Sequence, residues 1–430
     1  MFSNKRLLAG QVPWLTFYLH RLRERLWFKP LVVCILSTVL VLLAGQIDES
    51  IGAERVPDIS RDTIETLLSI LSASMLMMAT FAVGAMLSAY VSASNAATPR
   101  AFAVVVADDV SQNALSVFLG AFIFSVVALI ALLNDYYHQS GRFYLFLLTL
   151  GVLVLVVGSF VRWMDRIARL GRTATIIARV ETITAQALER ARQSPTLGGV
   201  PLITTPEGTA VYGQREGYVQ RVNVHELQKL AEHRDCRLAL LARPGIFASA
   251  GQPLVIVEGD CDEALEKAIV RAFVIADHRT FEEDPRFGLV VLAEIASRAL
   301  PPGINDPGTA IHIIGSLIRL LSGWARTEMI TEVEYDRVQV PPVAVEDMLD
   351  DAFGAIARDG RDLLEVAIRL QKGLYALSCL GDEVLTRASR FQALYALKHA
   401  QALSLPEDLE RVEHVARWAT NDSSPDSAAL

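Results

Sequence analysis

Cysteine is scarce in this sequence of 430 residues, which has only four. None of the four belongs to a Cys-x-x-Cys pair, so neither a disulfide framework nor a zinc site is indicated. The common catalytic signatures GxSxG, HExxH, GxxxxGKS/T and GxGxxG after a strand are missing as well. We therefore expect no cofactor and assign no catalytic or metal-ligating residue, and an enzyme is the weakest functional hypothesis.

Charged residues and histidine are missing from four long apolar stretches. Each stretch has about the 17–25 apolar residues that a helix needs to cross the hydrocarbon core of a bilayer. The sequence therefore predicts an α-helical integral membrane protein with four transmembrane helices, at about residues 30–47, 66–95, 112–134 and 143–162. Proton relays and charge-coupled transporters place ionisable groups within the membrane. The four predicted spans contain no such groups, which argues against both classes of protein.

Lysine and arginine are unevenly distributed around these predicted spans. They dominate the segment before the first span and the segment after the fourth, whereas the loop after the first span is mainly acidic. Because positive residues stay on the cytoplasmic side, we expect both termini to be cytoplasmic. The formal net charge of −8 gives no support for nucleic-acid binding, and the lipid bilayer is the expected partner of the basic segments.

Composition divides the rest of the chain into further segments. Residues 1–29 interleave arginine with aromatic residues, which predicts an amphipathic helix at the membrane surface. A cytoplasmic stalk helix and linker are predicted at 164–205, and a small β domain at 206–261. A mainly helical domain at 262–420 and a disordered tail at 421–430 complete the α+β cytoplasmic region. Within the helical domain, "AIVRAFVIADHR" could add one strand, and "VEYDRVQVPP" is interpreted as an exposed strand-like insert.

The second predicted span has small and polar residues at helical spacing, unlike the other three. The residues that fall roughly on one helical face are Ser69, Ala73, Met77, Thr80, Gly84 and Ser88. Small residues let helices pack closely, and hydroxyls can bond across an interface or line water. This face is a candidate for ordinary helix packing, with the lining of a pore or cavity as the alternative.

Turn-forming residues are concentrated in "ALPPGINDPGT", between two apolar helical stretches. The double proline stops the preceding helix, and Gly303 can take a positive φ. Asp306, or else Asn305, suits an N-cap before Pro307 at the first position of the next helix. A rigid corner or a subunit contact is therefore the favoured interpretation.

An ion or small-ligand site is the alternative interpretation of this corner. The oxygens of Asn305 and Asp306, together with Asp284 from the polar stretch before the helix, could coordinate a cation. The helix N-terminus with the Thr309 hydroxyl could attract an anion, although the acidic cap opposes this. The candidate functional corner thus consists of Asp284, Gly303, Asn305, Asp306 and Thr309.

"RTFEEDPRFGLVVLAEIASRALPPGINDPGTA" resembles the hallmark of a family of bacterial predicted membrane proteins, domain-of-unknown-function family 2254. The four apolar stretches, "TPRAF" after the second of them, and "GYVQRV" fit the same pattern, so the resemblance covers most of the chain. The matching positions are Arg279, Thr280, Asp284, Phe287, Gly288, Ser297, Ala299, Pro302, Gly303, Ile304, Asn305, Asp306, Pro307 and Thr309. The sequence departs from the pattern at Glu283, where glutamine is frequent, and at Pro301, where serine is frequent. The resemblance implies a four-pass protein of the bacterial inner membrane and supplies no activity.

Two functional hypotheses stand ahead of the enzyme. The first is a homo-oligomeric channel-like or gated membrane protein with a cytoplasmic regulatory domain. It needs several subunits, because four spans without charged residues cannot enclose much water alone. The second is a membrane-anchored sensor or scaffold, whose cytoplasmic domain binds a ligand or partner without transport. The number of subunits is the first observation that would separate the two.

Overall fold

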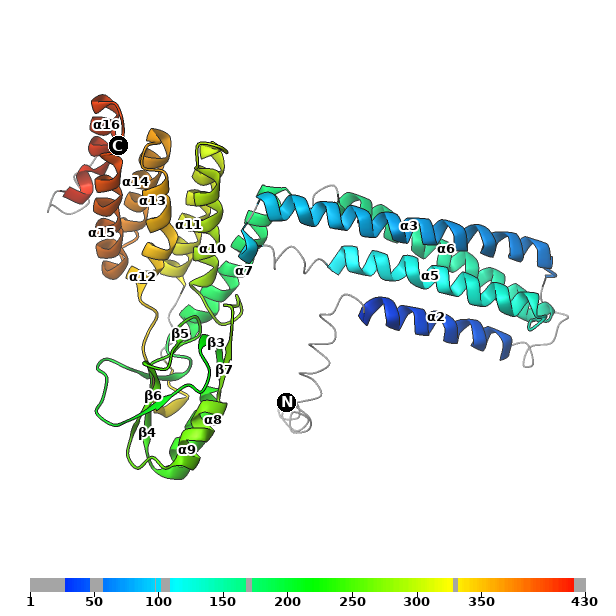
Figure 1. Ribbon diagram of the computed structural model, residues 1–430, viewed down its shortest axis with the longest axis horizontal. Helices are drawn as coiled ribbons and strands as arrows, with labels where there is room; N and C mark the ends of the chain where they lie inside the picture. The colour runs from blue at the N-terminus through cyan, green and yellow to red at the C-terminus, as the bar shows by residue number, and fades with distance from the viewer. Residues whose placement is uncertain are drawn as a thin grey trace, which may run out of the picture. The chain divides into compact units, whose positions relative to one another are not determined.

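The computed structural model describes residues 28–46, 57–96, 98–101, 109–167, 172–327 and 332–420 (Figure 1). The chain divides into two compact units, residues 1–176 and 177–430. Residues 1–27 of the predicted N-terminal amphipathic helix and the whole predicted tail at 421–430 lie outside the described residues.

Four long helices make up most of the described part of the first unit. They are α2 (Phe28–Gln46), α3 (Arg61–Ala96), α5 (Asp109–Leu133) and α6 (Gln139–Ile167), and they run side by side in Figure 1. The four predicted spans coincide with these helices to within a few residues at each end. α5 is the central helix, because it makes the most extensive contacts with the other three.

Three of the four helices are long and apolar enough to cross a membrane, over Arg61–Ser92, Val110–Leu133 and Gln139–Ile167. The corresponding stretch of α2, Phe28–Leu43, is shorter, because the described side chains of this helix end there. Large aliphatic side chains cover the outside of the bundle, and Leu36 and Val154 are more than half exposed. Such a continuous apolar surface suits lipid rather than water.

The second unit contains two β-sheets. The larger has five strands in the order β1-β8-β4-β6-β2, and the smaller has three in the order β5-β3-β7. The strands are β1 (Gly199–Pro201), β2 (Thr209–Tyr212), β3 (Gly217–Val222), β4 (Arg237–Leu240), β5 (Phe247–Ala248), β6 (Pro253–Glu258), β7 (Phe273–Ala276) and β8 (Tyr335–Val340). Two helices, α8 (Val224–Arg234) and α9 (Glu263–Arg271), pack on this β region.

The predicted boundary of the β domain at 206–261 is too narrow. β1 comes from the predicted linker, whereas β7 and β8 come from the predicted helical domain. "VEYDRVQVPP" is not an exposed insert, because β8 lies between β1 and β4 and pairs with both in parallel. Its alternate residues Val338 and Val340 are fully buried, so this pattern marks a strand with one face in the core.

Helices form the remainder of the second unit (Figure 1). They are α7 (Thr173–Gln193, which begins just before the boundary), α10 (Phe287–Ala299), α11 (Pro307–Arg326), α12 (Val345–Leu349), α13 (Ala355–Asp359), α14 (Leu364–Ser378), α15 (Glu383–Ala400) and α16 (Pro406–Thr420). A π-helical turn, η3 (Asp350–Gly354), joins α12 to α13 without a break. Buried leucine, isoleucine and alanine face inward from α10, α11, α14 and α15, which explains the predicted helical periodicity.

Candidate functional site

The corner at residues 301–306 is exposed and forms its hydrogen bonds locally. Asp306 is the N-cap of α11, as predicted, and Pro307 occupies the first helical position. One carboxylate oxygen of Asp306 accepts from the Thr309 N–H at 3.0 Å, and the other accepts from the Thr309 hydroxyl at 2.6 Å. The polar side chains of Asp306 and Thr309 are therefore already engaged with each other.

Asn305, and not Gly303, takes the left-handed conformation in this corner, with a φ of 50°. The expectation of a positive φ at Gly303 is therefore wrong. The backbone N–H groups of Ile304 and Asn305 both donate to the carbonyl of Pro301 at 2.9 Å, and these two bonds close the turn one residue later than expected. Asparagine tolerates the left-handed region better than most residues, which makes this placement inexpensive.

Asp284 does not belong to the corner. It precedes α10, whereas the corner follows the other end of the same helix. Thirteen residues at ~1.5 Å each place the two ends about 20 Å apart. The five residues predicted as one candidate site are therefore divided, with Asp284 at one end of α10 and Gly303, Asn305, Asp306 and Thr309 at the other.

Asp284 lies in a buried ion pair, and only 3% of its surface is exposed. The guanidinium of Arg279 donates to both carboxylate oxygens, at 2.6 and 3.0 Å. The backbone N–H groups of Arg286 and Phe287 also donate to this carboxylate, each at 3.1 Å. The aspartate thus caps the start of α10 and balances a buried positive charge at the same time.

A second arginine approaches this carboxylate from the loop after β4. Arg243 is buried and donates through one nitrogen to the carbonyls of Pro195, at 2.6 Å, and of Pro341. Burial lowers the pKa of Arg243 to about 10, although the negative charge of Asp284 acts in the opposite direction. Gly245 is required in the same loop, because its φ is +95° and a Cβ there would lie 2.5 Å from the Asp284 carboxylate.

Arg286 extends the network to the helical part of the unit. Its Nε donates to Asp351 at 2.6 Å and its Nη1 donates to Asp347 at 2.5 Å. The two aspartates are four residues apart, across the start of the π-helical turn, and so they reach the same guanidinium. Burial raises the pKa of Asp351, and the charge of Arg286 opposes this.

We name the set Arg243, Arg279, Asp284, Arg286 and Asp351 the charged junction. It joins the loop after β4, the segment before α10 and the turn η3, which are far apart in the sequence. Its carboxylates are all engaged by arginines. Within the part of the chain that the structure describes, no group of three or more His, Cys, Asp or Glu could hold a metal ion. The arrangement can fix segments against one another, and it offers no unpaired acid or base for chemistry.

The sequence contains a signal for part of this junction that the motif search missed. Arg279, Asp284 and Phe287 stand among the resemblance positions, but Arg243 and Asp351 do not. Arg243 stands directly between a buried run of apolar residues and a Pro-Gly turn. An arginine in such a place is rarely buried unless it is paired, so its position could have suggested a partner.

Gly288 marks a close crossing between α10 and α7. A Cβ at this position would collide with the side chain of Thr184, which is itself buried and bonds its own helix at the Val180 carbonyl. Glycine is therefore needed for the two helices to approach each other. The resemblance includes Gly288, but the sequence by itself does not say which helix it faces.

The six candidate residues of α3 all lie on its exposed side. The buried side of α3 consists instead of Ile64, Leu68, Leu71, Met75, Ala79, Ala82 and Met86. At ~100° per residue the two sets are nearly opposite on the helix. The face named by the sequence analysis therefore points away from the other described helices, and Thr80 donates its hydroxyl to the Leu76 carbonyl of its own helix at 2.9 Å.

The buried hydroxyls of the first unit lie mainly on α5 and α6. Ser116 and Ser125 on α5, and Thr149 on α6, are almost fully enclosed by the bundle. Each donates to a carbonyl four residues earlier in its own helix, at 2.7 Å. These hydroxyls are therefore satisfied by their own helices.

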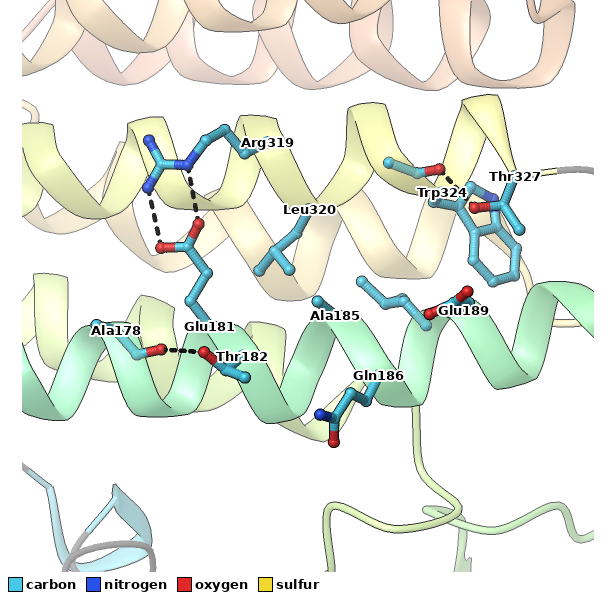
Figure 2. Close-up of a pocket in the computed structure, with 12 residues that line it drawn as sticks. Ala178, Glu181, Thr182, Ala185, Gln186, Glu189, Arg319, Leu320, Trp324 and Thr327 are labelled. Carbon is cyan, nitrogen blue, oxygen red and sulfur yellow. Dashed lines mark hydrogen bonds and ion pairs between the residues drawn. The ribbon is translucent and has the colours of Figure 1, made fainter.

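A groove of about 630 Å³ runs between α7 and α11 (Figure 2). At one end Arg319 forms a bidentate ion pair with Glu181, at 2.8 and 2.9 Å. At the other end the guanidinium of Arg192 lies 5.2 Å from the centre of the Trp324 ring. Burial acts to raise the pKa of Glu181, but hydrogen bonds from Arg319 and Ser316 outweigh it and leave this pKa below its usual value.

Comparison with known protein families identifies the family of this chain. Residues 23–376 match the model of the family described as predicted membrane protein, domain of unknown function 2254. The chain belongs to this family. The match includes the four helices of the first unit, the charged junction and the corner, so the resemblance of the "PGINDP" stretch is confirmed.

Similar curated proteins are known from mycobacteria. An uncharacterised protein of Mycobacterium bovis and one of Mycobacterium tuberculosis are each 29% identical to this chain over 163 residues, which is 36% of this chain. The matched region covers 30% of the length of each relative. No solved structure matches the chain.

Proposed function

We propose that this family member is a homo-oligomeric, channel-like protein of the bacterial inner membrane, with both termini in the cytoplasm and the second unit as its regulatory domain. In this proposal the outer faces of α3 from several subunits surround a common axis. The single observation that carries it is that the small and hydroxyl-bearing residues of α3 face outward, away from the bundle of their own chain.

The exposed faces of the helices differ in composition. α2 and α6 expose mainly leucine, valine and isoleucine, which suit contact with lipid chains. α3 interrupts its aliphatic surface with Ser69, Ala73, Thr80, Gly84 and Ser88, all exposed. Lipid gains nothing from such residues, whereas a second helix can approach them closely. The outer face of α3 is therefore the surface of the bundle best suited to a neighbouring subunit.

α2 is the fourth span in this proposal. Its 19 residues extend about 28 Å at 1.5 Å each, close to the ~30 Å of the hydrocarbon core. It packs tightly on α5, because the side chain of Val33 leaves no room for a Cβ at Gly120. The buried Tyr137 hydroxyl also donates to the Val41 carbonyl at 2.8 Å. These contacts support α2 as a full member of the bundle.

The charges at the ends of the bundle support the proposed orientation. Where α5 turns into α6, Arg61 pairs with Asp135, and Arg142 pairs with Asp58. Positive charge is therefore neutralised at this end. The opposite end carries the arginines that follow α6, and the sequence supplies fewer acidic residues there. A cytoplasmic location of that basic end agrees with the positive-inside rule.

The proposal is tested by placing a leucine at Gly84 and measuring the mass and the ion flux of the purified protein. Gly84 is exposed and a Cβ there would meet nothing within 4 Å, so we expect Gly84→Leu to leave the fold of the single chain intact. We expect the native chain to be an oligomer that carries ions across liposomes, and Gly84→Leu to lose both properties. Gly151→Leu is the matched control, because Gly151 is equally open on the exposed side of α6. A native chain that is monomeric in detergent and in nanodiscs would refute the proposal.

A membrane-anchored sensor or scaffold is the second candidate. One observation favours it: the hydroxyl of Thr80, on the outer face of α3, donates to the Leu76 carbonyl of its own helix and needs no water. A face of this kind can hold subunits together without conducting. An oligomer that shows no flux, and that Gly84→Leu still dissociates, would select this candidate over the channel.

A further inference from the structure

We propose that Arg319 and Arg369 bind a phosphoryl group over Gly315, where α11 packs against α14. Gly315 and Arg319 belong to α11, and Arg369 belongs to α14, so one compact unit supplies the whole site. The proposal goes beyond the proposed function, because it does not depend on whether the chain forms oligomers or conducts ions.

Two guanidinium groups converge on the position that a side chain at Gly315 would occupy. A Cβ there would lie 3.5 Å from Nη2 of Arg369 and 3.6 Å from Nη1 of Arg319. Since these two distances share one end point, the nitrogens lie no more than 7.1 Å apart, the sum of 3.5 and 3.6 Å. An anion with several oxygens can accept hydrogen bonds of ~2.8 Å from two nitrogens at such a separation.

Arg319 is held in place with one of its nitrogens unused. Its Nε and Nη2 donate to the Glu181 carboxylate at 2.8 and 2.9 Å, and Nη2 also donates to the Ser316 hydroxyl at 2.9 Å. Figure 2 shows the third nitrogen without a dashed line, on the side away from this carboxylate. The ion pair therefore fixes the guanidinium, and little conformational freedom is lost when Nη1 binds a ligand.

Arg369 supplies a positive charge that the folded chain leaves unbalanced. Its side chain is exposed and has no ion pair or hydrogen bond among the residues that the structure describes. Glu365, one turn earlier on α14, is exposed as well and does not pair with it. The two guanidinium groups together carry two positive charges against the single carboxylate of Glu181. The position over Gly315 therefore attracts an anion and repels a cation.

The chemistry of the two side chains selects the class of anion. A guanidinium group stays charged at every physiological pH, and its N–H groups match the oxygens of a phosphate. Like charges this close repel each other, and a dianion between them replaces the repulsion with attraction to both. A carboxylate brings one charge to two guanidinium groups, so a phosphoryl group fits better. Free phosphate and a lipid headgroup that ends in phosphate share this chemistry.

The test is calorimetric titration of inorganic phosphate into the purified full chain, in a neutral detergent and a buffer without phosphate. We expect Arg369→Gln to weaken binding about tenfold, the equivalent of ~1.4 kcal/mol. Gly315→Ala should weaken it too, because its methyl group occupies the position between the two nitrogens. Arg271→Gln is the matched control and should bind as the native chain does, because it removes another exposed and unpaired arginine of the described residues. Thermal unfolding of each variant checks its fold.

Three outcomes would overturn the inference. The first is a native chain that binds no phosphate, and the second is an equal affinity in Arg369→Gln and Arg271→Gln. The third is acetate binding as tightly as phosphate, which would refute a phosphoryl ligand.

Nanodiscs with and without phosphatidic acid distinguish the two sources of the phosphoryl group. If the lipid is the source, its presence should lower the apparent affinity of the native chain for free phosphate and leave that of Arg369→Gln unchanged. An affinity of the native chain that is the same in both kinds of disc identifies free phosphate as the ligand.

Discussion

The two units of this chain use polar side chains in opposite ways. In the first unit the buried hydroxyls of Ser116, Ser125 and Thr149 each bond their own helix four residues back. The second unit also buries charges, and Arg243 joins distant segments by donating to the carbonyls of Pro195 and Pro341. Lipid offers no hydrogen-bond partners, so a hydroxyl inside the membrane is stabilised by a hydrogen bond within its own helix. In the second unit, charged side chains can instead hold distant segments of the chain together through paired hydrogen bonds.

The largest expected effect of this difference is at Asp284. Replacing it by alanine leaves the half-buried Arg279 without its carboxylate and removes the negative charge near the buried Arg243, so we expect Asp284→Ala to lower the free energy of unfolding by about 3–5 kcal/mol. In the first unit, Ser125→Ala removes only a hydroxyl bonded to its own helix and should cost about 0.6 kcal/mol. Thermal unfolding of the full chain in detergent measures both. Equal losses would break the comparison between the units.

Asp306→Ala tests whether an exposed aspartate of the same family motif contributes less to stability than the buried Asp284. Asp306 caps α11 from an exposed corner, so its loss should cost about 0.5–2 kcal/mol, the usual value of an N-cap. A loss as large as that of Asp284→Ala would mean that the corner has a partner beyond its own helix.

An intermediate effect is expected where helices cross. Gly288→Ala forces a Cβ against Thr184, and we expect a loss of about 1–3 kcal/mol from overpacking. Gly323→Ala is the matched control on α11, where the space is open, and it should stabilise the chain by about 0.5–1 kcal/mol. Denaturant unfolding of the two variants should therefore move in opposite directions, and a stable Gly288→Ala would contradict the close crossing.

The smallest effect concerns the ion pair between Glu181 and Arg319, and it depends on pH. The pKa of Glu181 is lower in the folded chain than its ordinary value of 4.5, so the carboxylate stabilises the fold above that pH. The contribution is lost as the pH falls through the folded value. Glu181→Gln should cost about 0.2–1 kcal/mol at neutral pH and much less in acid.

Unfolding of wild type and Glu181→Gln between neutral and acidic pH measures this difference. Glu189→Gln serves as the control on the same helix, because Glu189 has no ion pair among the described residues, and it should change little. A difference between wild type and Glu181→Gln that stays constant into acid would show that the ion pair is not its cause.

Much of the local structure follows from the sequence. Apolar stretches without charges predicted the four helices of the first unit, and the cap at Asp306 with Pro307 behind it predicted the start of α11. These features depend on neighbours within one turn, so the residues that determine them are adjacent in the sequence. A β region within 206–261 was predictable for the same reason, and β2 to β6 lie in it.

The candidate sites were predicted less well, because their positions depend on how elements distant in the sequence pack together. Asp284 and the corner are close in the sequence and share a family motif, yet a helix of about 20 Å separates them. The polar residues of α3 could equally have faced the bundle, and only the packing against α5 decides that they face outward. The charged junction as a whole could not be predicted from the sequence, since Arg243 and Asp351 are more than 100 residues apart.

The sequence by itself therefore determined that this is a helical membrane protein with an attached α+β unit and a capped corner before α11. Hydropathy and capping act over a few residues and do not depend on the remainder of the fold. Only the tertiary structure decided that β8 lies inside a sheet, that α5 is the central helix, and that Asp284 is enclosed by Arg279 and Arg243. Those outcomes depend on which surfaces exclude solvent together, and that is a property of the assembled chain.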